Sequence, residues 1–322
     1  MATYLVTGAA GFIGSSIAEA LLERGASVRG LDNLSTGKME NVRPLIERGL
    51  EFIEGDIRNL EDCEKACAGV RIVFHQAALP SVPKSVIDPV GSHRSNIDGT
   101  LNVLMAAKQA GVHRIVYAGS SSAYGDTPTL PKHEEMKPSP ISPYAVQKLA
   151  GELYMQSFAQ VYGMETVTIR YFNVFGPRQD PSSPYSGVLA KFTMMMLAGQ
   201  EPTIYGDGKQ SRDFTYISDV VNGNLLAANA PAKKVSGRVF NVACNKQTDL
   251  NEAVEELRKI TGYSGPVHYA EERAGDVKHS LADISAAKEA FGYVPQVTFS
   301  EGLRKTVAWY REQEQTAGAV AR

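Results

Sequence analysis

The chain has 322 residues, of which 43% are hydrophobic and 21% are charged, as in a globular protein with one large domain or two domains around a cleft. Its net charge of −2 gives no sign of a basic surface for nucleic acid or for an anionic membrane. No apolar stretch approaches the roughly 20 residues that span a bilayer, and the first residues do not resemble a signal peptide. The three cysteines suit a reducing compartment, so we expect a cytoplasmic protein.

Short β-branched runs alternate with longer helical patterns, which predicts βαβ units and a parallel sheet. The expected strands are residues 4–7, 27–32, 51–54, 72–75, 114–118 and 166–170. Apolar residues at helical spacing predict a helix over 17–23, after the first strand. Glycine, proline, asparagine and serine predict loops over 173–184. Beyond them we expect a strand at 239–242 and a helix at 251–260, which Thr248 or Asp249 could cap.

A glycine-rich turn follows the first strand directly. Gly8, Gly11 and Gly14 have the spacing G-x-x-G-x-x-G, and glycine lets a backbone approach a pyrophosphate at a helix N-terminus. The same pattern also occurs in a plain tight turn. Asp32, however, ends the second strand, where a carboxylate accepts hydrogen bonds from the adenosine ribose and repels a 2′-phosphate. Together these features favour NAD over NADP.

The third strand is followed by Asp56 and Ile57, which are placed to meet the adenine ring, although Asp56 could instead cap a helix. The strand and helix pattern with this turn predicts an α/β protein with a doubly wound (Rossmann) parallel sheet. We expect residues 1–172 to form this NAD-binding domain. Residues 173–322 would form mainly a smaller α/β substrate-binding lobe, with an interleaved boundary.

The pair Tyr144 and Lys148 is the sharpest feature of the sequence. Ser142 is a plausible N-cap and Pro143 a first helical residue, so the pair lies one turn apart on one face, roughly 6 Å along the axis. Free tyrosine has a pKa near ~10, which we expect an ammonium, a nicotinamide cation and the helix N-terminus to lower. Tyr144 is then a candidate acid–base group, although most such pairs are solvated helix faces.

Three consecutive serines, Ser120, Ser121 and Ser122, follow the fifth strand. Doubly wound sheets bind ligands at the carboxyl ends of their strands. A hydroxyl here can therefore bridge a substrate oxygen and Tyr144, and the alternative is a serine-rich turn without a chemical role.

The chain resembles the extended short-chain dehydrogenase/reductase family and, within it, the UDP-hexose 4-epimerases. The matching segments occur in the family's order across nearly the whole chain. They are GAAGFIG, Asp32-Asn33, HQAALPSV (75–82), Asn96, SSSAYGD (120–126), SPYAVQK (142–148), RYFNVFGPRQDP (170–181), YGDGKQSRDFTYI (205–217) and RAGDVKHSLAD (273–283).

The resemblance implies NAD as the cofactor, and Ser120, Tyr144 and Lys148 as the catalytic residues. It also implies a set of cofactor-binding residues along the carboxyl edge of the sheet. These are Gly8, Gly11, Phe12, Ile13, Gly14, Asp32, Asn33, Ser35, Gly37, Asp56, Ile57, Gln76, Ala77, Ala78, Asn96, Tyr144, Lys148 and Tyr171.

For the substrate, the resemblance implies that Arg212 and Arg273 clamp the diphosphate, because a planar guanidinium binds phosphate bidentately. Their alternative is a surface ion pair. Asp276 would meet the uridine ribose. The other substrate residues implied are Lys84, Ser121, Ser122, Asn173, Val188, Leu189, Tyr205 and Ser280.

Two departures from related enzymes narrow the reaction. Sugar 4,6-dehydratases carry an Asp-Glu pair where this chain has Ser121 and Ser122, and UDP-glucuronate decarboxylases carry a glutamate at the second position. Without an acid for water loss or decarboxylation, oxidation and reduction remain. Ser280 stands where glucose-only epimerases have a tyrosine, which leaves room for a 2-acetamido group.

The expected function is a 4-epimerase of UDP-hexoses, including UDP-GlcNAc and UDP-GalNAc as well as UDP-Glc and UDP-Gal, that works through a transient 4-keto sugar. A UDP-glucuronate 4-epimerase, whose serine or threonine hydroxyls meet the carboxylate, is one alternative. A catalytically idle NAD-sensing scaffold is another. We expect no metal, and the resemblance implies a homodimer packed through helices near 96–111 and 144–162.

Overall fold

The computed structural model describes residues 3–181, 187–272 and 278–320. Seven parallel strands form the main sheet in the order β11-β6-β5-β4-β1-β2-β3. They are β1 (Thr3–Thr7), β2 (Ser27–Asp32), β3 (Glu51–Glu54), β4 (Ile72–His75), β5 (Arg114–Ser120), β6 (Glu165–Tyr171) and β11 (Arg238–Val242). The ends of the predicted strands are confirmed to within two residues. The doubly wound parallel sheet is confirmed as well. The strand order reverses between β1 and β4, which opens a crevice at their carboxyl ends.

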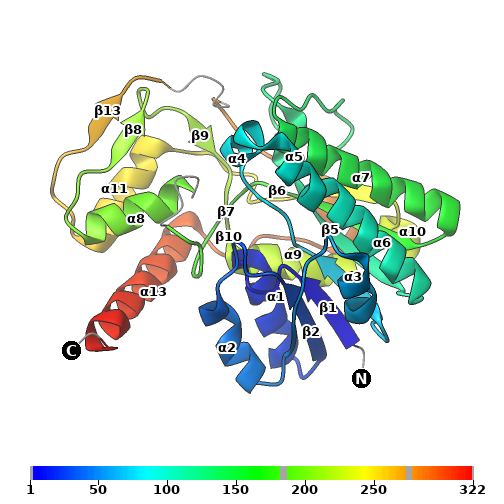
Figure 1. Cartoon of the computed structure of the whole chain (residues 1–322). Helices are drawn as coiled ribbons and strands as arrows, with labels where there is room; N and C mark the ends of the chain where they lie inside the picture. Colours follow the sequence, from blue (N-terminus) through cyan, green and yellow to red (C-terminus); the bar gives the residue numbers. More distant parts are fainter. Residues whose placement is uncertain (1–2, 182–186, 273–277, 321–322) are drawn as a thin grey trace.

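Helices cover both faces of this sheet (Figure 1). One face carries α1 (Phe12–Glu23), α2 (Met39–Glu47) and α9 (Ile217–Asn229), and the other carries α3 (Leu60–Cys67), α6 (Gly99–Gln109) and α7 (Pro143–Tyr162). Two hydrophobic clusters fill the layers between sheet and helices, and Cys63 and Cys67 are buried in the second one. Short helices α4 (Val82–Ile87) and α5 (Pro89–His93) lead into a π-helical turn at Arg94–Asp98, which continues as α6.

A smaller group of elements lies beside the carboxyl end of the sheet, at the left of Figure 1. Helix α8 (Val188–Leu197) packs against α11 (Leu250–Thr261), which also contacts α13 (Phe299–Val320). The short strands are β8 (Thr203–Tyr205) with β13 (His268–Ala270), and β9 (Ser211–Arg212) with β12 (Thr248–Asp249). Of the two expected caps, Asp249 is the one that begins α11, in a capping box with Glu252.

The chain passes between the two parts more than once. After residue 173 it returns to the large sheet to form α9, α10 (Ala232–Val235), β11 and α12 (Ser285–Phe291). The expectation of loops over 173–184 is wrong at its start, because β7 (Asn173–Phe175) pairs in parallel with β10 (Phe214–Tyr216). Such a short strand depends on a partner from distant sequence, which local composition does not reveal.

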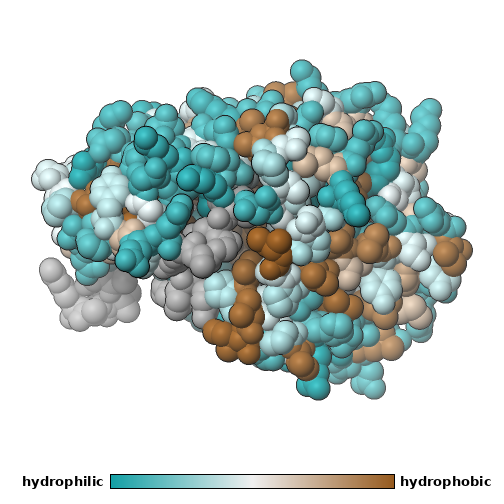
Figure 2. All heavy atoms as spheres, turned by 90° about the horizontal axis from the view of Figure 1, so that it is seen from above, coloured by the Kyte–Doolittle hydropathy of each residue, from teal (hydrophilic) through white to brown (hydrophobic). Residues whose placement is uncertain are grey.

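Apolar side chains are exposed along α4 to α7. On α7, Val146, Leu153 and Val161 are 50%, 55% and 68% exposed, and Met105 on α6 is 44% exposed. The spacing of the three α7 residues places them on one side of the helix. Figure 2 shows hydrophobic side chains gathered in patches on the face seen from above. In the described part of the chain no helix is long and apolar enough to cross a membrane.

Candidate active site and cofactor cavity

The glycine turn between β1 and α1 has no room for side chains at two positions. Gly8 has φ +70°, and a Cβ on it would lie 2.8 Å from the backbone nitrogen of Ala77. A Cβ on Gly14 would lie 2.0 Å from the carbonyl oxygen of Gly8. Gly11 is the N-cap of α1 and supplies no side-chain cap, so the first N–H groups of the helix are left for an anion.

A cavity of about 650 Å³ opens at the carboxyl ends of the central strands, a size typical of cofactor sites. It contains the glycine turn, all three expected catalytic residues and nearly every expected cofactor residue. Its lining includes Gly8, Gly11, Phe12, Ile13, Gly14, Asp32, Asn33, Ser35, Gly37, Asp56, Ile57, Gln76, Ala77, Ala78, Ser120, Tyr144, Lys148 and Tyr171. The glycine cradle, the uncapped helix and the cavity's size fit a dinucleotide.

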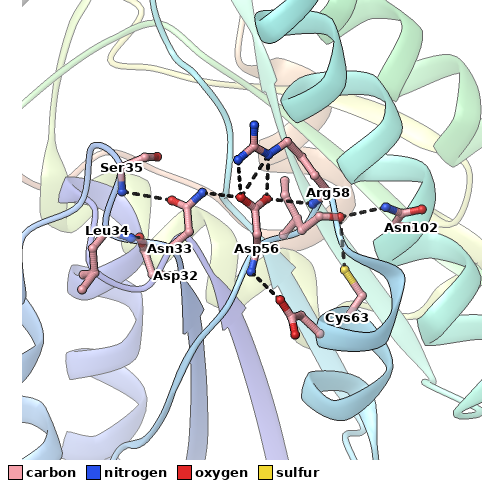
Figure 3. A network of polar contacts seen from close by, with 10 residues as sticks. Asp32, Asn33, Leu34, Ser35, Asp56, Arg58, Cys63 and Asn102 are labelled. Atoms are coloured by element: carbon pink, nitrogen blue, oxygen red, sulfur yellow. Dashed lines mark hydrogen bonds and ion pairs between the residues drawn. The ribbon is translucent and has the colours of Figure 1, made fainter.

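Asp32 lies where β2 ends and lines this cavity (Figure 3). Its carboxylate accepts hydrogen bonds from the backbone N–H groups of Ala10 and Leu34, at 2.9 and 2.8 Å. Burial raises the pKa of Asp32, and these two N–H groups partly oppose the rise. The carboxylate therefore also holds the glycine turn in place.

Asp56 is held by a network that sequence reasoning did not foresee (Figure 3). Arg58 forms an ion pair with its carboxylate at 2.6 Å, and the Asn33 amide donates to it at 2.8 Å. Burial alone would raise the pKa of Asp56, but Arg58 and Asn33 outweigh burial and lower it to about 2. Asp56 does not cap α3, because Asn59 does so. The only sequence signal for this pair was its two-residue spacing.

Ile57, beside Asp56, is anchored through its carbonyl oxygen. The amide of Asn102 donates to that oxygen at 3.0 Å, and the thiol of Cys63 does so at 3.4 Å. Both contacts are drawn in Figure 3 and join the end of β3 to α3 and α6. They hold the backbone of Ile57, whose apolar side chain we expected next to adenine.

Helix α7, which carries Tyr144 and Lys148, begins as predicted. Ser142 accepts a hydrogen bond from the backbone N–H of Ala145 at 3.2 Å, and Pro143 occupies the first turn. Lys148, one turn after Tyr144, donates from Nζ to the carbonyl oxygen of Ala118 at 2.8 Å. Burial lowers the pKa of Lys148 to about 8, against the opposing charge of Glu152.

The pKa of Tyr144 lies above its ordinary value. Burial disfavours the phenolate more than the hydrogen bond with Ser120 favours it. The lowering expected from the sequence is therefore wrong for the protein groups taken alone. The physical reason is burial, and Lys148 donates from Nζ to the Ala118 carbonyl oxygen. A cationic nicotinamide ring is the remaining expected source of a charge that would favour the phenolate.

A buried ion pair lies one turn beyond Lys148. Glu152 and Arg170 meet at 2.7 Å with side chains only 2% and 3% exposed. The Arg170 guanidinium also lies 4.5 Å from the ring centre of Tyr124. The sequence showed this pair only as a continuation of the spacing from Tyr144 to Lys148. The ion pair therefore places two charged groups one helical turn from Lys148.

A second cavity, of about 250 Å³, adjoins the first and is lined by five of the expected substrate residues. These are Asn173, Val188, Leu189, Tyr205 and Arg212. Val174, Gln179 and Gly187 line both cavities, so the two spaces share a wall. Residues far apart in sequence, from the α8 region and from β8 and β9, thus meet beside the candidate catalytic groups.

Some expected contact residues lie elsewhere. Asn96 does not line the first cavity, because its buried side chain bonds to the backbone of Leu79 and to Gln147. It therefore positions the segment after β4. Lys84, expected at the substrate, lines the first cavity with the cofactor residues.

Three more expected substrate residues, Ser121, Ser122 and Ser280, lie outside the lining of the second cavity. Ser121 and Ser122 begin the 3₁₀ helix η2 (Ser121–Tyr124) directly after Ser120. The backbone N–H of Ser280 donates to the carbonyl oxygen of Ser211 at 3.0 Å, which fastens its segment to β9. Arg273 and Asp276 lie outside the described residues.

Other residues of the first cavity were not expected from the sequence. Lys38 and Asp180 form an ion pair at 3.3 Å, and Arg178 pairs with Glu19 at 2.8 Å. These contacts tie the segment after β7 to α1 and to the turn before α2. The segment belongs to the quoted RYFNVFGPRQDP motif, which was the available signal. Among the described residues no group of three His, Cys, Asp or Glu could hold a metal ion.

Comparison with known proteins gives a consistent picture. The model of the NAD dependent epimerase/dehydratase family matches residues 4–243. The UDP-glucose 4-epimerase of Mycolicibacterium smegmatis is 38% identical over 315 residues, which cover 97% of this chain and 99% of that protein.

Solved structures resemble the chain over nearly its whole length. The UDP-N-acetylglucosamine 4-epimerase of Methanobrevibacter ruminantium M1, in complex with UDP-N-acetylmuramic acid, is 42% identical with a TM-score of 0.91, covering 97% of this chain and 99% of that one. The UDP-glucose 4-epimerase of Thermus thermophilus, in complex with NAD, is 38% identical with a TM-score of 0.87, covering 96% and 99%.

Proposed function

This chain belongs to the NAD dependent epimerase/dehydratase family, and on that basis we propose that it inverts the C4 hydroxyl of UDP-linked hexoses. It is an NAD-dependent isomerase, like its UDP-sugar epimerase relatives. The observation that carries the proposal is that the two cavities adjoin each other. Ser120, Tyr144 and Lys148 line the space that the glycine turn opens, and a second cavity with Arg212 adjoins it.

In this proposal NAD would be held by the residues that line the first cavity and would supply the hydride chemistry there. Tyr144 takes the proton of the C4 hydroxyl and later gives a proton back to the same oxygen. Ser120 hydrogen-bonds to the phenol oxygen of Tyr144. Lys148 lies one turn away, where its Nζ donates to the Ala118 carbonyl oxygen, and it would bind the nicotinamide ribose of the cofactor.

The substrate's nucleotide would occupy the second cavity. Arg212 lies there beside the apolar faces of Val188, Leu189 and Tyr205, which suits a diphosphate next to a base. A sugar that is anchored by its diphosphate can turn over where the two cavities meet. The cavity next to Tyr144 would then receive either face of C4.

For the sugar, we propose that both plain hexoses and 2-acetamido hexoses are accepted. The support is the small side chain of Ser280, which takes the place of the bulky tyrosine of glucose-only epimerases. The chain resembles a UDP-glucose 4-epimerase and a UDP-N-acetylglucosamine 4-epimerase to a similar degree. A direct comparison of the sugars is therefore the deciding experiment.

The purified protein is incubated with UDP-GlcNAc, UDP-glucose and UDP-glucuronate separately, with and without added NAD, and products are separated by anion-exchange chromatography. UDP-GalNAc and UDP-galactose are the expected products. Conversion of UDP-glucuronate alone would replace the proposal with the glucuronate epimerase. No conversion of any sugar in the presence of NAD would refute it.

The Ser280→Tyr variant tests the sugar assignment in the same assay. Its turnover of UDP-GlcNAc should fall by at least tenfold while turnover of UDP-glucose is kept, because a tyrosine would fill the acetamido space. Equal retention of both activities would contradict this part of the proposal and leave the epimerase reaction itself intact.

We also propose that the enzyme is a cytoplasmic homodimer. Three free cysteines support a reducing compartment. The exposed apolar residues of α6 and α7 support an interface between two copies, since such a surface is otherwise costly in water.

A further inference from the structure

The hydroxyl of Ser120 is enclosed by its own chain. Ser120 ends β5 and is the N-cap of η2, with its side chain accepting from the backbone N–H of Ser122 at 3.2 Å. The side-chain hydroxyl of Ser122 lies 2.8 Å from the same oxygen. Among the described residues, the Ser122 hydroxyl has no other hydrogen-bond partner. Ser122 therefore contacts Ser120 twice, through its backbone and through its side chain.

The number of bonds that a hydroxyl can make gives this arrangement a direction. A serine hydroxyl has one proton to donate and two lone pairs that accept. When both groups of Ser122 donate to Ser120, the two lone pairs of Ser120 are occupied. The Ser120 proton must then point elsewhere, and the phenol of Tyr144, whose pKa the Ser120 hydroxyl lowers, lines the same cavity.

We propose that Ser122 is a positioning residue that orients this chain of hydroxyls, so that Ser122 donates to Ser120 and Ser120 donates to the phenol oxygen of Tyr144. This inference rests on the proposed function, in which Tyr144 is the acid–base group. Ser122 itself need not touch the substrate. Its role differs from the glutamate that decarboxylases carry at this position.

The direction of the chain has a consequence for both halves of the reaction. When Tyr144 is a phenolate, the proton of Ser120 stabilises its charge. When Tyr144 is protonated, Ser120 cannot accept that proton, because its lone pairs are filled. The phenol must then donate to another oxygen, and the C4 oxygen of the sugar is the expected acceptor.

Other titratable and polar groups lie around Tyr144. Lys148 lies on the same helix, Tyr117 on β5 is electrostatically coupled to Tyr144, and Lys84 on α4 lines the same cavity. Ser85, also on α4, accepts the backbone N–H of Tyr144. His75 on β4 lies near Lys148. All of them stay in place in a Ser122 variant, so a change in the titration reports the hydroxyl chain.

The test compares the pH dependence of kcat in the wild type, Ser122→Ala and Ser122→Thr. In Ser122→Ala the apparent pKa of the basic group should rise, and kcat at neutral pH should fall roughly tenfold, the effect of one lost hydrogen bond, with KM unchanged. Ser122→Thr keeps the hydroxyl and should restore both values. Ser139→Ala, an exposed serine that packs beside η2, should match the wild type.

A double-mutant cycle separates positioning from a loss of local structure. In a Ser120→Ala background the chain is already broken, so Ser122→Ala should produce no further rise in the pKa. An equal rise in both backgrounds would overturn the proposal. So would a Ser122→Ala profile identical to that of the wild type.

A final measurement keeps this inference separate from the epimerase proposal. The ultraviolet titration of Tyr144, taken as the difference between each protein and its Tyr144→Phe counterpart, requires no turnover and removes the signal of the other tyrosines. The phenolate should form at higher pH in Ser122→Ala than in the wild type. An absent shift refutes the hydroxyl chain even in an active enzyme, whereas a shift in a protein that converts no sugar refutes only the epimerase proposal.

Discussion

At the scale of single residues, Tyr144 lies in an environment that keeps it protonated. Burial raises its pKa, and Lys148 is engaged by a carbonyl oxygen. The burial of Lys148 lowers its own pKa to about 8, so its charge is sensitive to mildly alkaline pH. The proposed acid–base pair therefore needs a further positive charge to favour the phenolate of Tyr144, and we expect the oxidised cofactor to supply it.

The Tyr144→Phe variant should keep NAD binding and lose most activity, by ~10²–10⁴-fold, because the acid–base oxygen is removed and the ring is kept. Epimerisation rate and bound NAD per subunit are measured on the same preparation. Tyr154→Phe, a second tyrosine on α7, is the matched control and should remain active. An undiminished rate in Tyr144→Phe would refute the role of this residue.

His75 is a buried histidine with a predictable effect on stability. Its ring nitrogens lie 2.7 Å from Thr7 and 3.0 Å from Thr100. Burial, with a smaller contribution from Lys148, lowers its pKa from 6.5 to about 3. Between these values the unfolded chain binds a proton that the folded chain does not, so stability falls as the pH falls.

Chemical denaturation of the wild type and of His75→Gln tests this linkage. From pH 7.5 to 5 the wild type should lose ~2 kcal/mol more stability than the variant, since one proton contributes about 1.4 kcal/mol per pH unit. His268→Gln replaces an exposed histidine and should keep the slope of the wild type. Parallel pH profiles for the wild type and His75→Gln would contradict the assignment.

At the scale of elements, the turn between β1 and α1 determines how close a cofactor can come. Gly14 brings the first turn of α1 against the Gly8 carbonyl, with no room for a methyl group. The loop is further fixed from outside, since Asp32 accepts the Ala10 N–H and the Asn41 amide donates to the Ala10 carbonyl at 2.9 Å. One added carbon at Gly14 therefore moves backbone as well as side chains.

Gly14→Ala should lower NAD affinity at least tenfold and destabilise the fold by ~1–3 kcal/mol, as overpacking does. Calorimetric titration with NAD and thermal unfolding measure the two effects. Ser16→Ala, on the same helix, removes only a hydrogen bond to the Phe12 carbonyl and serves as control. Unchanged NAD affinity in Gly14→Ala would mean that the turn does not approach the pyrophosphate.

At the scale of the whole molecule, the two faces of the sheet differ in what covers them. The smaller group of elements, which includes α8, α11 and α13, lies at one end of the molecule (Figure 1). The outer sides of α6 and α7 carry exposed apolar residues that no described element covers. Charged residues there would oppose association, because each would be desolvated between two subunits. This face is the one that we expect to join two copies.

Sedimentation velocity tests the assembly. The wild type should sediment as a dimer and Leu153→Glu as a folded monomer. Ile46→Glu introduces the same charge at an exposed apolar residue on α2, on the opposite face of the sheet, and should remain dimeric. A monomeric wild type at micromolar concentration, or a dimeric Leu153→Glu, would contradict the proposed interface.

Local sequence was enough to predict the strands of the main sheet and their order along the chain. Strand period, the Ser142 cap with Pro143, and the glycine turn are properties of short stretches of chain, so each stretch indicates its own conformation. Nearly the entire expected cofactor set lines one cavity for a related reason: most of these residues lie at or just beyond the end of a parallel strand.

The tertiary structure decided which side chains contact one another and how burial and partners shift their pKa values. Asn96 supports Leu79 instead of lining the cofactor cavity, Arg58 pairs with Asp56, and Lys148 points its ammonium at a carbonyl oxygen. The pairing of β7 with β10 likewise required a distant partner. Burial and hydrogen-bond partners come from segments far apart in the chain, and no local pattern encodes them.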